Sequence, residues 1–154
     1  ASLTRSEIEV KAMGGEAAAG NFSSAPYFMG HQSPENEKFV ESYLRRYGDD
    51  QVTHFVSEAA YFQVYQFKAA VEKLSPSDIT PANIREAVVG LRMNAPQGEV
   101  EVDPNLHTHL WPKIAQWQSN GQAKVVVQSE ERVAPDPYWA YEGQECTAEG
   151  VVRS

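Results

Sequence analysis

The order of the predicted elements between Ser33 and Val127 constrains the fold of this chain most, because three helices are followed by a β-hairpin. The first helix begins at Ser33-Pro34-Glu35, which places a capping hydroxyl, a proline and an acidic group at the helix start. The hairpin is predicted at Asn120-Gly121, a pair that suits a tight turn between two strands. We therefore expect this segment to contain both helices and strands, and it does not look like a complete domain with a catalytic site of its own.

The second predicted helix runs from Ser57 to Leu74 and is apolar around much of its circumference. Its apolar residues are Ala59, Ala60, Phe62, Val64, Phe67, Ala70 and Val71. Such a helix is expected to be buried on more than one side. The third helix is predicted to begin at Thr80-Pro81, where a capping hydroxyl precedes a proline.

Shorter elements are predicted on both sides of the helices. Thr4-Arg5-Ser6-Glu7 fits a capping box, in which Thr4 accepts a backbone N–H and Glu7 reaches back. Asn21–Phe28 reads as a short strand. Glu99–Asp103 alternates charged residues with valines and predicts a half-exposed strand, which follows a turn at Asn94–Gly98.

The composition is that of a globular protein, with 42% hydrophobic and 22% charged residues among 154. The net charge of −8 argues against a nucleic-acid partner, because binding phosphates requires a basic surface. No apolar run approaches the roughly 20 residues that span a bilayer, so we expect no membrane insertion. The single cysteine, Cys146, excludes an internal disulfide and fits either the periplasm or the cytoplasm.

The sequence holds few candidates for chemistry. His107-Thr108-His109 has a spacing that could bind a metal from a strand, but only Asp103 is near as a further ligand, so a polar loop is the favoured interpretation. Cys146 lies among acidic residues, which raise a thiol pKa. No G-x-S-x-G, G-x-G-x-x-G or P-loop motif occurs. We therefore predict no catalytic residues, no metal and no cofactor.

Glu58 is the most informative polar residue, because it stands in the first turn of the apolar helix. One interpretation is that its carboxylate complements the positive helix end. The other is that this turn forms the rim of a cleft, where the carboxylate accepts hydrogen bonds from a ligand. Aromatic walls would then come from Tyr27, Phe28, Phe55 and Tyr61, which are alternatively plain core residues.

Five groups of residues occur in an order that resembles the type 1 periplasmic binding protein family. They are Ser2-Leu3-Thr4 with Glu7, Glu9, Met13 and Ala25-Pro26-Tyr27-Phe28; Ser33-Pro34-Glu35-Asn36 with Phe39-Val40; Glu58-Ala59-Ala60-Tyr61-Phe62; Asn94-Ala95-Pro96-Gln97-Gly98 with Val100 and Val102; and Ile114-Ala115, Asn120-Gly121, Gln128-Ser129 and Pro135-Asp136-Pro137-Tyr138. They are most similar to the branch that holds the urea-binding components of ABC transporters and the amide sensor of the aliphatic amidase operon.

This resemblance implies a partial two-lobed α/β fold, with parallel sheet layers flanked by helices and a C-terminal β-hairpin. Residues 1–26 would belong to the second lobe, residues 27–93 to the first, and residues 94–138 to the second again, followed by a tail at 139–154. Members of the family are much longer, so we expect the chain to be incomplete alone. A homo-oligomer or a missing N-terminal portion would complete it.

The resemblance also implies function: recognition of urea or a short aliphatic amide, and not catalysis. The partner would be an ABC permease, for a periplasmic protein, or a regulatory protein, for a cytoplasmic amide sensor. The expected ligand contacts are Thr4, Tyr27, Phe28, Phe55, Glu58 and Tyr61. A self-associating structural fragment that binds no ligand is the alternative from another class.

Overall fold

The computed structural model describes residues 5–135, 146–147 and 150–151 of the chain. The helices and strands follow one another in the order α1 Glu7–Met13, α2 Gly15–Ala18, β1 Phe22–Ala25, α3 Pro34–Tyr47, α4 Phe55–Glu72, the 3₁₀ helix η1 Pro76–Asp78, α5 Pro81–Val88, β2 Arg92–Ala95, β3 Gly98–Val102, β4 Thr108–His109, β5 Lys113–Trp117, β6 Ala123–Gln128, β7 Cys146–Thr147 and β8 Gly150–Val151. None of the helices described is both long and apolar enough to cross a membrane.

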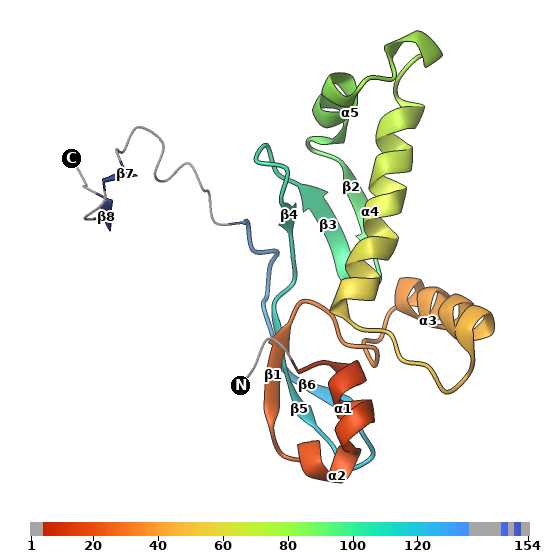
Figure 1. Ribbon diagram of the computed structural model, residues 1–154, viewed down its shortest axis with the longest axis vertical. Coiled ribbons are helices and arrows are strands. Elements are labelled where there is room, and N and C mark those ends of the chain that lie inside the picture. Colours follow the sequence, from red (N-terminus) through yellow and green to blue (C-terminus); the bar gives the residue numbers. More distant parts are fainter. Residues whose placement is uncertain (1–4, 136–145, 148–149, 152–154) are drawn as a thin grey trace.

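Two three-stranded sheets organise the molecule. One has the order β1-β5-β6 and lies beside α1 and α2; the other has the order β2-β3-β4 and lies beside α4 and α5 (Figure 1). Every strand pair that the structure describes is antiparallel, whereas the resemblance implied parallel layers. The difference has a topological reason. Short turns join β2 to β3 and β5 to β6, and parallel neighbours need long crossover connections.

The β1-β5-β6 sheet carries one hydrophobic core. Alternate residues of β1 and β5 point to the same face, where Ala25, Ala115 and Trp117 pack against Val10 of α1 and Ala18 of α2. The indole nitrogen of Trp117 donates a hydrogen bond of 2.9 Å to the buried hydroxyl of Ser23, which satisfies both groups.

A second core lies between α4 and the β2-β3-β4 sheet. Phe62 packs there with Ala95 and Val100, because one face of α4 is turned towards the strands. The expectation that α4 is buried on more than one side is wrong for this structure, since Val64 and Phe67 are exposed.

Two of the four predicted helix starts, at Ser33 and Thr80, are confirmed, whereas the helix predicted from Ser57 begins at Phe55. Ser33 accepts a hydrogen bond from the backbone nitrogen of Asn36, and Thr80 accepts one from that of Asn83. The predicted capping box at Thr4-Arg5-Ser6-Glu7 is wrong, because the box is formed by Ser6 and Glu9. The helix begins later than expected because Ser6 adopts the extended backbone of the cap.

Two hairpins complete the sheets. The predicted hairpin at Asn120-Gly121 joins β5 to β6. The predicted turn at Asn94–Gly98 is narrower than expected, because Ala95 already pairs with Gly98 across Pro96 and Gln97. Gly98 has a φ of 123° there, and a Cβ would lie 2.9 Å from the indole nitrogen of Trp111. This hairpin spans the expected boundary between residues 93 and 94, so the segment 94–138 contributes strands to both sheets.

Candidate functional site

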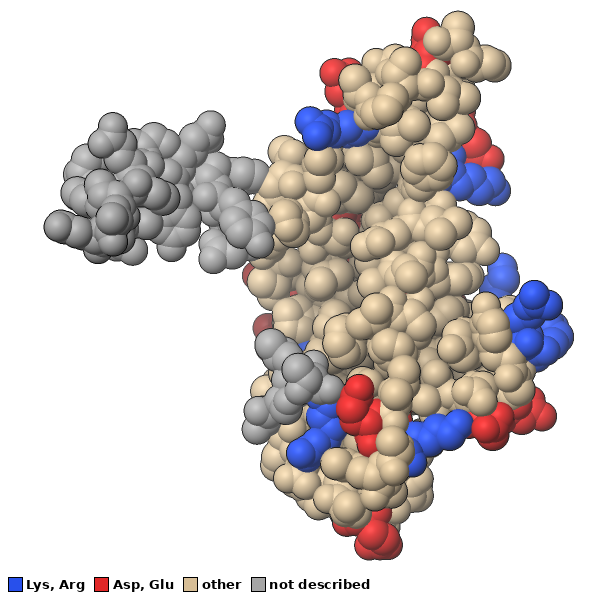
Figure 2. All heavy atoms as spheres, in the orientation of Figure 1, with Lys and Arg blue, Asp and Glu red and all other residues tan. Residues whose placement is uncertain are grey.

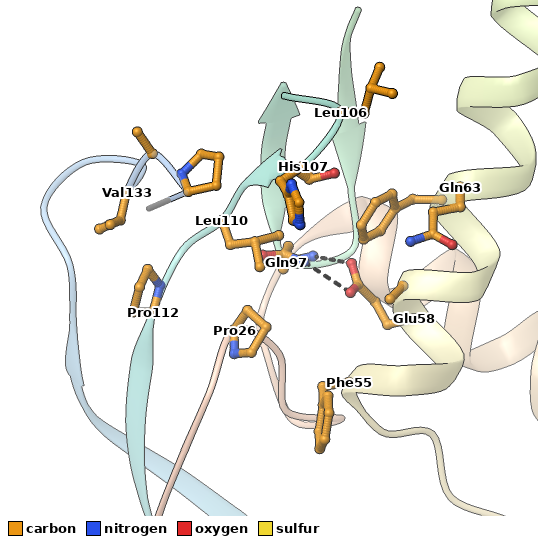
Figure 3. Close-up of a pocket in the computed structure, with 15 residues that line it drawn as sticks. Pro26, Phe55, Glu58, Gln63, Gln97, Leu106, His107, Leu110, Pro112 and Val133 are labelled. Atoms are coloured by element: carbon orange, nitrogen blue, oxygen red, sulfur yellow. Dashed lines mark hydrogen bonds between the residues drawn. The ribbon is translucent and has the colours of Figure 1, made fainter. Parts of the chain in front are cut away.

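A cavity of about 490 Å³ lies where the two sheets meet, beside the first turns of α4 (Figure 3). Most of its wall is apolar, formed by Pro26, Phe55, Ala59, Phe62, Leu106, Leu110, Pro112, Val133, Ala134 and Pro135. The polar part of the wall is formed by Glu58, Gln63, Gln97, His107 and Thr108. An apolar cavity of this size with a few polar groups is typical of small-molecule sites.

Glu58 and Gln97 form the polar end of this cavity. Glu58 is in the first turn of α4, and Gln97 is in the turn between β2 and β3. The side-chain nitrogen of Gln97 donates to Oε2 of Glu58 at 3.0 Å, and the backbone nitrogen of Gln97 donates to Oε1 at 3.4 Å (Figure 3). Although both residues form part of the wall, their side chains are buried, so the hairpin holds the carboxylate in a fixed position.

Lys113, the first residue of β5, places a buried ammonium group behind this pair. Its Nζ donates to the backbone oxygens of Pro26 at 2.8 Å, Gln97 at 3.2 Å and Trp111 at 3.2 Å. These three carbonyls belong to the segment that leaves β1, the β2–β3 turn and the segment that enters β5. The Lys113 side chain therefore links three segments: the one after β1, the one before β5, and the β2–β3 turn that forms part of the cavity wall.

Burial changes the proton affinity of both charged groups. It raises the pKa of Glu58 to about 7, against the lowering influence of the hydrogen bonds from Gln97 and of the Lys113 charge. Burial lowers the pKa of Lys113 to about 8, against the opposing influence of the Glu58 charge. Each charge favours the charged form of the other, and Gln97 contacts both groups, because it donates to Glu58 and its backbone oxygen accepts from Lys113.

The structure brings two of the six expected ligand contacts to the cavity, Phe55 and Glu58. Tyr27 is buried elsewhere, and its hydroxyl donates to Oδ1 of Asn36 at 2.8 Å and lies 2.7 Å from Thr53 Oγ1. Burial raises the pKa of that hydroxyl well above its ordinary value. Thr4 lies outside the described residues.

The other two expected aromatic walls are core residues. Phe28 packs edge-on against Trp117 with ring centroids 6.0 Å apart. Tyr61 contacts Phe39 of α3 with ring centroids 4.6 Å apart. Phe28 is buried against the β1-β5-β6 sheet, and Tyr61 points from α4 towards α3, so neither side chain contributes to the wall of the cavity.

A second buried carboxylate lies near Tyr27. Oε1 of Glu7 accepts a hydrogen bond of 2.6 Å from the backbone nitrogen of Met29, whereas the buried Oε2 has no hydrogen-bond partner. Burial raises the pKa of Glu7 to about 7. This group anchors α1 to the segment after β1, but it does not line the cavity.

His107 and His109, the two histidines with the predicted metal-binding spacing, lie in different surroundings. His109 Nε2 lies 3.0 Å from Oδ1 of Asp103, and His107 borders the cavity. Within residues 5–135, 146–147 and 150–151, no three His, Cys, Asp or Glu side chains are grouped closely enough to hold a metal ion.

Sequence reasoning missed Gln97 and Lys113 as site residues. Gln97 was visible only as part of a turn. Lys113 carried a signal that was not used, because it alternates with Ala115 and Trp117 and so shares their buried face. A lysine on the buried face of a strand needs partners for its charge.

The chain belongs to the periplasmic binding protein domain family, which it matches over residues 1–144. Among curated relatives, the Leu/Ile/Val-binding protein homolog 6 of Brucella abortus is 33% identical over 90 residues, which are 58% of this chain and 23% of that protein. A protein of Geobacillus stearothermophilus named limonene hydroxylase is 29% identical over 129 residues, or 81% of this chain and 23% of the relative.

Solved structures show the same fold. The crystal structure of an ABC-transporter solute-binding protein from R. palustris, in complex with benzoate, matches with a TM-score of 0.72 at 16% identity. The match covers 82% of this chain and 34% of that protein. The α/β class and the partial binding-protein fold predicted from the sequence are thus confirmed. The chain spans about a quarter of its curated relatives and a third of this structural one.

Proposed function

We propose that this chain is part of a solute-binding protein of an ABC-type uptake system, and that the cavity beside Glu58 contributes to its solute site. Family membership supports the general role. The cavity supports the location, because its apolar wall and its single polar end suit a small molecule held by hydrogen bonds and packing. The observation that carries the proposal is the carboxylate of Glu58, fixed by Gln97 at the polar end.

For the solute we propose urea or a short aliphatic amide. Both present N–H donors that a carboxylate accepts, and both are uncharged, so their burial costs little once these donors are paired. Glu58 is the proposed acceptor and Phe55 the proposed packing surface. Thr4 and Tyr27 remain proposed polar contacts, and Phe28 and Tyr61 remain proposed aromatic contacts. Tyr27, Phe28 and Tyr61 would reach a solute in the cavity only if the surrounding backbone moved.

We propose that the two sheets belong to two lobes. The β1-β5-β6 sheet with α1 and α2 would be one lobe, and the β2-β3-β4 sheet with α3, α4 and α5 would be the other. The connections near Pro26 and Trp111 would then act as a hinge, and Lys113 would hold them together. Lobe closure of this kind is a common response to ligand binding.

The proposed partner depends on the cellular setting. In the periplasm, the closed form would be recognised by a membrane permease. In the cytoplasm, a regulatory protein would take that role and the chain would serve as an amide sensor. Family membership supports the periplasmic transport role, which we favour.

An NMR titration of the isolated chain with urea and acetamide tests the proposed site. Because the chain spans only part of its relatives, we expect weak binding, with Kd above about 1 mM. Resonances of Glu58 and Phe55 should shift, and Glu58→Gln should weaken acetamide binding several-fold. The exposed Glu72, changed to Gln on the same helix, is the control. The proposed site would be contradicted by resonance shifts confined to residues far from the cavity. It would also be contradicted by an acetamide affinity that is the same in Glu58→Gln as in the unaltered chain.

Self-association is the second candidate function, and one observation favours it. Val56, Val64 and Phe67 leave an exposed apolar stripe along α4, with Val64 66% and Phe67 56% exposed. Figure 2 shows the middle of this face of the molecule as largely uncharged, with charged side chains towards its margins. Exposed apolar patches commonly mark protein contacts. Light scattering at increasing protein concentration distinguishes a monomer from an assembly.

A further inference from the structure

Several hydrogen-bond donors at the polar end of the cavity already have partners within the protein. Both nitrogens of Gln97 donate to Glu58, and the backbone nitrogen of Trp111 donates to the side-chain oxygen of Gln97 at 3.3 Å. The three hydrogen bonds of the Lys113 ammonium group all go to backbone oxygens. An ammonium group has three protons, so this lysine has none left for a solute.

The wall of the cavity carries a carboxylate, and the ammonium group of Lys113 lies behind it. Among the described residues that line the cavity, Glu58 is the acidic one, and no lysine or arginine is present. The carboxylate also stands in the first turn of α4, where it occupies the positive helix end that would otherwise attract an anion. The other polar lining groups are the amide of Gln63, the hydroxyl of Thr108 and the ring of His107.

We propose that this cavity selects solutes by charge: it accepts uncharged molecules with N–H donors and rejects carboxylates of the same shape. The inference rests on the proposed solute site and adds a rule for what enters it. A carboxylate in the cavity would lose water, find the strongest donors occupied and face Glu58. A primary amide of equal size would instead offer its N–H groups to that carboxylate.

The size of the cavity makes a sharp comparison possible. A space of about 490 Å³ admits a six-membered ring, and the prolines and phenylalanines of its wall suit one. Benzamide and benzoate have the same ring and nearly the same shape, and they differ in the charge and donors of one group. Their affinity ratio therefore reports charge selection separately from packing.

The experiment is a pair of NMR titrations of the full 154-residue chain with benzamide and benzoate at about pH 8, above the Glu58 pKa of about 7. We expect benzamide to bind at least about tenfold more tightly, as like charges in a partly buried site repel each other. Glu58→Gln should reduce that ratio several-fold, because the variant removes the negative charge and keeps the shape. Glu72→Gln should leave it unchanged.

Each outcome decides a different point. If benzoate binds as tightly as benzamide, charge selection is contradicted, but the proposed solute site is not. An unchanged ratio in Glu58→Gln would overturn it as well. Failure of both probes to shift cavity resonances at about 50 mM would overturn the proposed solute site itself. If Glu58→Gln does not fold, the ratio measured on the unaltered chain is decisive alone.

Discussion

The side-chain nitrogen of Gln97 lies 3.0 Å from Oε2 of Glu58, and this contact joins the β2–β3 turn to the first turn of α4. Both side chains are buried. The Gln97 backbone oxygen accepts from Lys113, so the same residue contacts both buried charged groups. The polar end of the cavity is therefore held by one glutamine at the tip of a hairpin.

Gln97→Ala should destabilise the chain and raise the pKa of Glu58. The substitution removes one of two donors to a buried carboxylate, which costs about 1–3 kcal/mol of unfolding free energy. The pKa of Glu58, already about 7, should rise further because its charged form loses a hydrogen bond. Carboxyl ¹³C NMR measures the pKa, and urea denaturation measures the stability. An unaltered Glu58 titration would contradict the structural role of Gln97.

Lys113→Met should be strongly destabilising, by about 3–5 kcal/mol, because it leaves three backbone oxygens without a donor and the Glu58 charge without its partner. The double variant Lys113→Met with Glu58→Gln should recover part of that loss, since it removes the unpaired charge. Denaturant unfolding of the two single variants and the double variant gives the coupling energy. Lys124→Met, on the exposed part of β6, is the control, and strictly additive effects would contradict the pairing.

Deprotonation of the Glu7 carboxyl group should lower the unfolding free energy of the chain as pH rises. Its pKa is about 7 in the folded state and 4.5 ordinarily, so the folded chain binds this proton more tightly than the unfolded chain does. The unfolding free energy should therefore fall between about pH 4.5 and 7, by up to roughly 3 kcal/mol from this group. Glu7→Gln keeps an acceptor for Met29 and should flatten that part of the pH profile. Thermal unfolding across the range tests this, with exposed Glu16→Gln as control.

Phe67→Glu should reduce self-association without unfolding the chain. The side chain is exposed, so the substitution should change the unfolding free energy by less than about 0.5 kcal/mol. It also places a charge in the apolar stripe of α4, which should shift any assembly towards the monomer. Light scattering and circular dichroism measure the two effects, and Lys68→Gln is a neighbouring control. An unaltered chain that stays monomeric at every concentration would show that the stripe makes no self-contact.

Local features predicted from the sequence were mostly correct because local interactions form them. Ser33 and Thr80 cap helices through backbone groups a few residues away, and Asn120-Gly121 forms its turn from its own backbone preferences. The Thr4 capping box was wrong because Ser6 and Glu9 offer the same side-chain pattern two residues later. Sequence alone did not distinguish between these two competing registers.

The α/β class, the helix order and the hairpin followed from the sequence itself. Tertiary structure alone decided which side chains share the cavity. Phe55 and Glu58 reach it, whereas Tyr27, Phe28 and Tyr61 do not, although all five are close in sequence to its wall. The reason is physical: helix caps and turns depend on neighbours in the chain, but the positions of Gln97 and Lys113 depend on contacts between segments far apart in sequence.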